Sequence, residues 1–122
     1  MPESLGTMGR QAECFRMRVR AVADVVVVEL HGELDLVADA RLTPRMDTLT
    51  CRERPVIVMD LGGVTFMDVC GLRLLLRALA RVRERGGNLR IVPGTQLVAR
   101  ILRLTGTAAG FCLLERTPPD LT

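Results

Sequence analysis

Residues 55–72 read PVIVMDLGGVTFMDVCGL, and this stretch decides how the rest of the chain is interpreted. Pro55–Leu61 is a nearly unbroken apolar run, which is typical of a strand buried on both faces of a sheet. The strand is expected to end at Gly62–Gly63, and Val64–Leu72 is expected to connect it to a helix. The stretch therefore predicts one strand–loop–helix unit of an α/β fold.

The helix that follows has the clearest pattern in the chain. Leu72–Arg85 is expected to be helical and to end at Gly86–Gly87. The predicted buried stripe consists of Leu72, Leu75, Leu76, Leu79 and Val82, and the opposite stripe of Arg73, Arg77, Arg81 and Arg85. We interpret the arginine stripe as a solvated face, with attraction to an acidic patch on a partner as the alternative.

Further elements are expected on both sides of this unit. Phe15–Ala21 alternates apolar residues with arginine, which is typical of an edge strand with one solvated face. The β-branched run Val25–Leu30 follows a short turn, so the two segments predict an antiparallel hairpin. Downstream, we expect a strand at Asn88–Val92, a helix at Gln96–Leu104 and a last strand at Phe111–Leu114.

The segment Leu36–Thr50 has helical spacing but contains Pro44. Proline removes a hydrogen-bond donor from a helix interior and is favoured at the first helical position. We expect a short turn followed by a helix that Thr43 caps and Pro44 begins. The alternative is a helix that starts near Ala38 and is kinked at Pro44.

Alternating strands and helices predict a mainly parallel, mixed sheet of about five strands, with helices packed against it and right-handed crossovers. The chain has 122 residues, enough for one domain. We place that domain at residues 14–116, between tails at 1–13 and 117–122.

The composition argues against nucleic-acid binding. There are 17 basic residues, all arginine, and 14 acidic ones, which gives a net charge of +3. The chain has three Phe and no Tyr or Trp, so it offers little for bases to stack on. Acidic residues are also spread among the arginines instead of leaving a basic stripe.

No metal, cofactor or membrane insertion is expected. Cys14, Cys51, Cys70 and Cys112 form no CxxC pair, and the single His31 lacks the spacing of a metal ligand. The longest uncharged run, residues 104–114, is far shorter than the roughly 20 apolar residues that span a bilayer. The start of the chain has no secretory-signal pattern, so we expect a cytoplasmic protein.

Two acidic residues follow buried strands and are candidates for a binding site. Asp35 comes shortly after the strand Val25–Leu30, and Asp68 lies between the strand Pro55–Leu61 and its helix. In a parallel sheet both positions lie at the edge where ligands and partners usually bind. We therefore expect Asp35 and Asp68 to approach each other on one rim.

At these residues the chain resembles the STAS family, named for sulfate transporters and anti-sigma factor antagonists. The motifs are GELD at Gly32–Asp35, VIVMDL at Val56–Leu61 and TFMD-x-x-GL at Thr65–Leu72. The double glycine Gly86–Gly87 and the sequence LTG at Leu104–Gly106 also fit. The resemblance covers about residues 15–115.

Small members of this family resemble anti-sigma factor antagonists, which are non-catalytic. They bind an anti-sigma factor, often a serine kinase, and so free a sigma factor for transcription. The kinase then phosphorylates a hydroxyl in a D-S-[ST]-G-L loop, which breaks the complex because phosphate brings nearly two negative charges into the interface. The resemblance assigns partner binding to Asp35, Asp68, Val69, Cys70, Gly71 and Leu72.

This chain departs from the family at the phosphoacceptor position. That position holds Val69, which has no hydroxyl, and the next holds Cys70. We therefore carry over the binding role but not the phosphorylation switch. Because valine is uncharged and close to threonine in shape, the loop should resemble the unphosphorylated, binding-competent form.

Structural interpretations of the same residues remain open. Asp35 and Asp68 are also suited to cap helices, and Gly71 to allow close packing of a helix on a strand. Cys70 is a candidate redox switch because a thiol near a helix N-terminus can be reactive, although Asp68 disfavours the thiolate.

An enzyme is the first competing function. A phosphatase-type loop needs an arginine six residues after its cysteine, and that place holds Leu76, so an enzyme is not expected. A STAS subunit of a lipid transporter or of a stress-signalling complex is the alternative function, because fold resemblance does not choose the partner.

Overall fold

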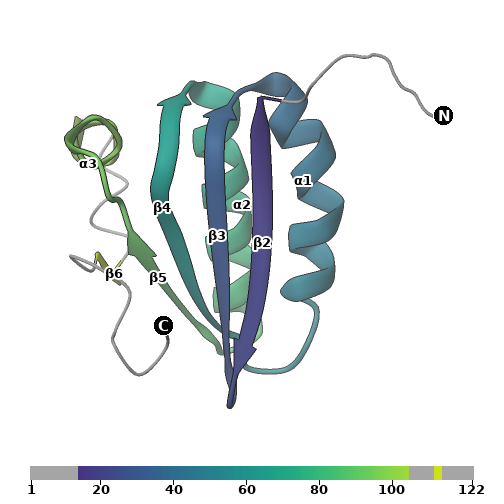
Figure 1. Ribbon diagram of the computed structural model, residues 1–122. Coiled ribbons are helices and arrows are strands. Elements are labelled where there is room, and N and C mark those ends of the chain that lie inside the picture. The colour runs from purple at the N-terminus through teal and green to yellow at the C-terminus, as the bar shows by residue number, and fades with distance from the viewer. Residues whose placement is uncertain (1–13, 105–111, 114–122) are drawn as a thin grey trace, which may run out of the picture.

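The computed structural model describes residues 14–104, 112 and 113 (Figure 1). The predicted tails, the LTG sequence beyond Leu104, and the positions Phe111 and Leu114 lie outside the described residues. In chain order the elements are β2 (Phe15–Val22), β3 (Val25–Leu34), α1 (Leu36–Leu49), β4 (Val56–Met67), α2 (Val69–Glu84), β5 (Asn88–Val92), α3 (Gln96–Leu104) and β6 (Cys112–Leu113).

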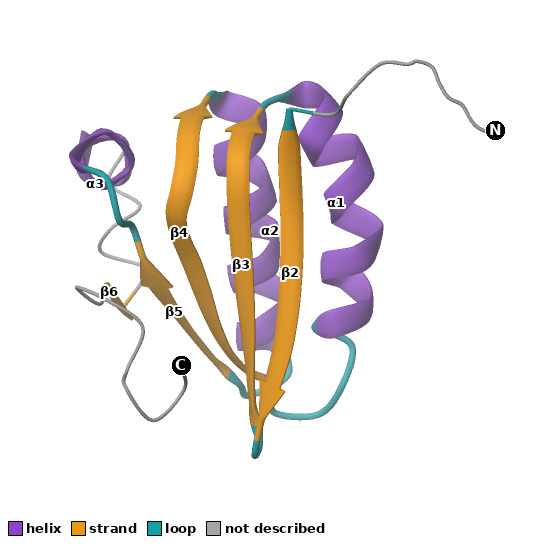
Figure 2. Ribbon diagram, in the orientation of Figure 1, coloured by secondary structure: helices purple, strands orange, loops and turns teal. Residues whose placement is uncertain are grey.

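The predicted sheet is confirmed. Its order is β2-β3-β4-β5-β6, so β2 lies at an edge. β2 pairs antiparallel with β3 as a hairpin, and the other three pairings are parallel. Figure 2 shows α1 and α2 side by side against one face of this sheet. The fold is therefore a mixed α/β layer with its two long helices on one side.

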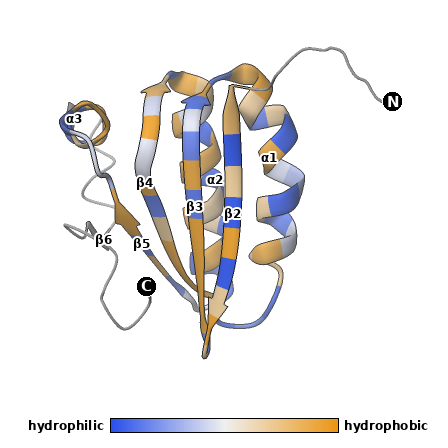
Figure 3. Cartoon of the chain, in the orientation of Figure 1, coloured by the Kyte–Doolittle hydropathy of each residue, from blue (hydrophilic) through white to orange (hydrophobic). Residues whose placement is uncertain are grey.

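Side chains alternate across the sheet between two apolar clusters. The larger cluster lies between the sheet and the helices, and includes Val26, Val28 and Leu30 of β3. The smaller cluster contains Val27, Val58 and Val92, which belong to the opposite face. β3 is thus buried on both faces, as predicted, whereas Figure 3 shows hydrophilic and apolar residues alternating along β2.

The prediction that the third strand ends at Gly62–Gly63 is wrong. β4 continues through both glycines to Met67. Its pairing with β3 is irregular at two places, where β3 advances from Glu29 to His31 and from Gly32 to Glu33. At each place β4 advances one residue more than β3, so two bulges bend the strand without ending it. Glycine in a strand interior marks such bulges as well as strand ends.

The preferred interpretation of α1 is also wrong. The helix runs without a break from Leu36 to Leu49, with Pro44 inside it, so the start near Ala38 was the better alternative. Ala38, Leu42 and Met46 are buried at four-residue intervals, and this packing holds the helix together across the proline. Pro44 lies on the exposed side, where water can bond the carbonyl group that the missing N–H leaves free.

α2 starts three residues earlier than predicted, and its buried face is rotated. Leu75, Leu79 and Val82 are buried as expected, but Leu76 is exposed and Leu72 is half-buried. Gly71, Leu74 and Ala78 complete the buried face. The predicted end is confirmed: Gly86 has a φ of +70°, and the N–H groups of Gly86 and Gly87 donate to the carbonyls of Arg83 and Val82.

The arginine stripe of α2 is largely solvated, as expected, since the side chains of Arg73 and Arg77 are 67% and 49% exposed, and it also contacts α1. Arg73 donates to the Asp39 carboxylate at 2.8 Å, and Arg81 donates to the Thr50 hydroxyl at 2.8 Å. Arg77 makes two hydrogen bonds with Asp47, at 2.9 and 2.8 Å. The arginines therefore tie α2 to α1 along the outer side of the helical layer. Arg85 instead caps the C-terminus of α2.

Asp47 is expected to make the stability of the domain depend on acid pH. Hydrogen bonds from Arg77, more than the nearby charge of Arg81, lower the pKa of Asp47 below its ordinary value of 3.8. Its contribution to the unfolding free energy is therefore complete above pH 3.8 and is lost as the pH falls through the lower pKa of the folded state.

Urea unfolding of the wild type and of Asp47→Asn tests this expectation. The wild type should be the more stable protein at about pH 7, and the difference should shrink towards about pH 3. A difference that stays constant over this range would contradict the assignment to the carboxylate.

Candidate functional site

The ends of β3 and β4 bring Asp35 and Asp68 to one edge of the sheet. Leu34 and Met67 are partners in the parallel pairing, and each is the last residue of its strand. The N–H of Asp68 donates to the carbonyl of Leu34 at 3.3 Å. The two acidic residues follow directly, so they start α1 and α2 at neighbouring places, as Figure 1 shows at the top of the sheet. We call this edge the rim.

Both aspartates cap helices, which confirms their structural interpretation. Asp35 Oδ1 accepts from the N–H of Ala38 at 3.1 Å. Asp68 Oδ1 accepts from the N–H groups of Cys70 and Gly71 at 2.8 and 3.2 Å. A carboxylate at a helix N-terminus is also favoured by the helix dipole. Both side chains are half-buried, so capping does not withdraw them from the surface.

Gly71 lets α2 approach the strand ends. A Cβ added there would lie 2.7 Å from Met67 Cγ and 2.8 Å from Leu34 Cβ, and still closer to the carbonyl oxygen of Leu34. Because real Cβ atoms essentially never come within 3.0 Å of such atoms, the contact requires glycine. The predicted packing role of Gly71 is thus confirmed, and the residue is itself buried.

The remaining residues of the predicted site differ in exposure. Val69, the first residue of α2, is 76% exposed. Cys70 is a half-buried free thiol, and its proximity contributes to the raised pKa of Arg73 after the larger effect of Asp39. Leu72 is half-buried and packs against the core. Val69 is therefore the residue of this loop that is most available to a partner.

Sequence reasoning missed three exposed apolar residues near the rim. Leu36 and Val37, which begin α1, are 62% and 53% exposed, and Phe66 near the end of β4 is 46% exposed. Leu36 and Val37 could have been found from a helix capped by Asp35. With the side chain of Ala38 in the core, those of the two preceding residues point towards solvent. Phe66 lies in the stretch expected to connect a strand to a helix, where strand alternation predicts nothing about exposure. These residues and Val69 are named the apolar rim residues below.

Comparisons with known proteins agree on the fold. The STAS domain family model matches residues 16–120. A crystal structure of an anti-sigma factor antagonist from Mycobacterium paratuberculosis superimposes with a TM-score of 0.72 and 27% identity, over 88% of this chain and 91% of the other. Within the described helices, none has both the length and the apolar character needed to cross a membrane.

Two curated relatives extend the comparison. The anti-sigma-F factor antagonist RsfA of Mycobacterium tuberculosis is 30% identical over 84 residues, which are 66% of this chain and 65% of that protein. The anti-sigma F factor antagonist of Paenibacillus polymyxa is 30% identical over 83 residues, or 67% of this chain and 71% of that protein. The family match, the rim and these relatives agree, and the chain belongs to the STAS domain family.

Proposed function

We propose that this protein is an anti-sigma factor antagonist, without catalytic activity, that acts in the cytoplasm. Its rim binds an anti-sigma factor of the serine-kinase type, and this binding releases a sigma factor. The names of the relatives support this class of partner. The observation that carries the proposal is the exposed, uncharged side chain of Val69 at the start of α2.

The chemistry of the rim suits a protein partner. Contiguous apolar side chains on a protein surface commonly mark interaction sites. Here Leu36 and Val37 are exposed at the start of α1. Phe66 is exposed near the end of β4, and Val69 at the start of α2. The capping carboxylates of Asp35 and Asp68 lie next to them in the chain and supply a negative border. A matching partner surface has apolar residues with basic residues around them.

Val69 also determines how the complex is regulated. Valine has no hydroxyl and cannot accept a phosphoryl group, so a kinase partner cannot introduce charge at this position. A phosphate there would stand beside the Asp68 carboxylate and repel it. We therefore propose that the rim stays competent for binding in the presence of ATP.

A displacement experiment tests the function. The purified chain is added to a preformed complex of a sigma factor with an anti-sigma factor from the same genome, and free sigma factor is measured by size-exclusion chromatography. Release of sigma factor that rises with antagonist concentration is expected.

Asp68→Asn tests the rim in the same assay. An asparagine still caps the helix, so the domain stays folded while the rim loses a charge. Weaker release by this variant is expected, and unchanged release would remove Asp68 from the interface. If the wild type releases no sigma factor from any anti-sigma factor of the genome, the function is wrong. A STAS subunit of a lipid transporter or stress-signalling complex would then take its place.

A further inference from the structure

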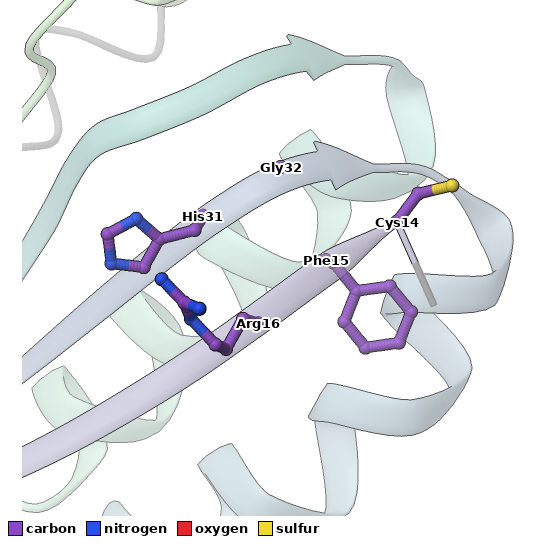
Figure 4. Close-up of a pocket in the computed structure, with 5 residues that line it drawn as sticks. All are labelled: Cys14, Phe15, Arg16, His31 and Gly32. Atoms are coloured by element: carbon purple, nitrogen blue, oxygen red, sulfur yellow. The ribbon is translucent and has the colours of Figure 1, made fainter. Parts of the chain in front are cut away.

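A second cluster of polar side chains lies on the sheet face that α1 and α2 leave open. Arg16 of β2 and His31 of β3 are direct partners in the antiparallel pairing. Their chain neighbours Met17 and Leu30 pack on the helical side of the sheet, so the side chains of Arg16 and His31 project from the opposite face. Figure 4 shows the Arg16 guanidinium pointing to the His31 imidazole, whereas Phe15 points the other way.

Hydrogen bonds and ion pairs leave these two groups incompletely satisfied. Farther along β2, Arg20 and Arg18 both approach Glu29, at 3.3 and 3.9 Å. Arg16 has no hydrogen bond or ion pair with the residues that the structure describes. The Nε2 atom of His31 is buried without a hydrogen bond, and its nearest carboxylate oxygen, on Glu29, is 3.7 Å away. A buried polar atom without a partner is costly and calls for a ligand or water.

The surroundings form a shallow pocket, widely open to solvent, of about 400 Å³ lined by Cys14, Phe15, Arg16, His31 and Gly32. Gly63 fixes the imidazole at its edge: a Cβ there would collide with the ring, so only glycine lets the ring lie across β4. Gly32 has a φ of +87° and allows the carbonyl of Cys14 to approach its Cα, where that carbonyl accepts from the N–H of Glu33 at 2.7 Å. The pocket is therefore built by glycines at two neighbouring positions.

We propose that this Arg16–His31 pocket binds a small oxyanion of the phosphate class. A guanidinium presents a planar fork of N–H donors that matches phosphate oxygens. A bound anion would also balance the positive charge of Arg16, which lies against the His31 imidazole. The pocket volume exceeds a phosphate ion and leaves room for an organic group.

The test is an NMR titration of the full chain, labelled with nitrogen-15, with inorganic phosphate and, separately, with adenosine monophosphate. Sodium chloride at matched ionic strength controls for screening. We expect saturable shifts at Arg16, His31 and Gly32 with both phosphate compounds and not with chloride. Tighter binding of the monophosphate would identify a phosphate ester as the ligand, and equal binding would identify the free ion. Adenosine should not compete.

Three variants decide whether the pocket holds the anion. Arg16→Gln and His31→Phe, which keeps a ring but no nitrogen, should each weaken phosphate binding by about tenfold. Arg90→Gln removes the same charge from β5 on the same face and is the matched control, expected to change the affinity less than about twofold. Thermal unfolding checks that every variant is folded.

Three results would overturn the proposal. The first is equal NMR shift changes with phosphate and with chloride, and the second is competition by adenosine, which carries no phosphate. The third is an equal loss of phosphate affinity in Arg16→Gln and Arg90→Gln. The pocket does not include the rim residues, so these outcomes leave the proposed antagonist function untouched.

Discussion

Val69→Asp is expected to abolish partner binding while the domain stays folded. Val69 is 76% exposed and begins α2, so its replacement disturbs no packing and should change the unfolding free energy by no more than about 0.5 kcal/mol. In the interface, however, the carboxylate would be desolvated beside Asp68. Charges introduced at the centre of an interface cost about 2–4 kcal/mol, which is roughly 30- to 1000-fold in affinity.

A matched control separates this effect from a general change of charge. Leu97 is 50% exposed and belongs to α3, which lies at the other end of the sheet from α1 in Figure 1. Leu97→Asp adds the same charge and should leave affinity for the anti-sigma factor unchanged. Isothermal titration calorimetry of both variants gives the comparison. Similar affinities for Val69→Asp and the wild type would move the binding site away from the rim.

Gly71→Val is expected to cause the largest loss of stability among single substitutions at the rim. Any Cβ at this position meets the carbonyl of Leu34 and the side chain of Met67, and a β-branched residue adds two methyl groups to that contact. Overpacking of this kind costs about 1–3 kcal/mol and occasionally more, and α2 must also move away from the strand ends. Partner binding should fall as well, because Val69 would shift with the helix.

Two further variants show the cause. In an ordinary helix interior, Gly→Ala raises the unfolding free energy by about 1 kcal/mol. Gly71→Ala is expected to lower it instead, because the added Cβ meets Leu34 and Met67. Ala80→Gly on the exposed face of α2 should show the ordinary helix propensity, with a loss of about 1 kcal/mol. Urea unfolding measures all three. A Gly71→Ala protein more stable than the wild type would contradict the close packing of α2 on Leu34.

The strands could be predicted because burial and periodicity agree in them. The alternation in Phe15–Ala21 and the apolar run in Val25–Leu30 each have one physical reading, and the structure places both in strands, which extend to Val22 and Leu34. Glycine and proline were misleading because their local effect depends on packing. Gly62–Gly63 permit bulges within β4, and Pro44 is tolerated in α1 because the opposite side of that helix is buried.

The site could be predicted only in part. Asp35 and Asp68 were found because each carries a strong local signal as a cap after a strand. The apolar rim residues Leu36, Val37 and Phe66 were missed because their exposure depends on where α1 begins and where β4 ends. The ion pairs of Arg73 and Arg77 with α1 join residues at least 30 positions apart. Such contacts depend on how the helices pack, which no local pattern contains.

The central claim is that Val69 makes this antagonist bind without a phosphorylation switch. The direct measurement is the stability of its complex with a kinase-type anti-sigma factor during incubation with magnesium and ATP. Size-exclusion chromatography follows the complex, and mass spectrometry locates any phosphate. The wild-type complex should persist without phosphate on residues 68–72, while Val69→Ser should become phosphorylated and dissociate. Dissociation of the wild-type complex with phosphate in that loop would contradict the account.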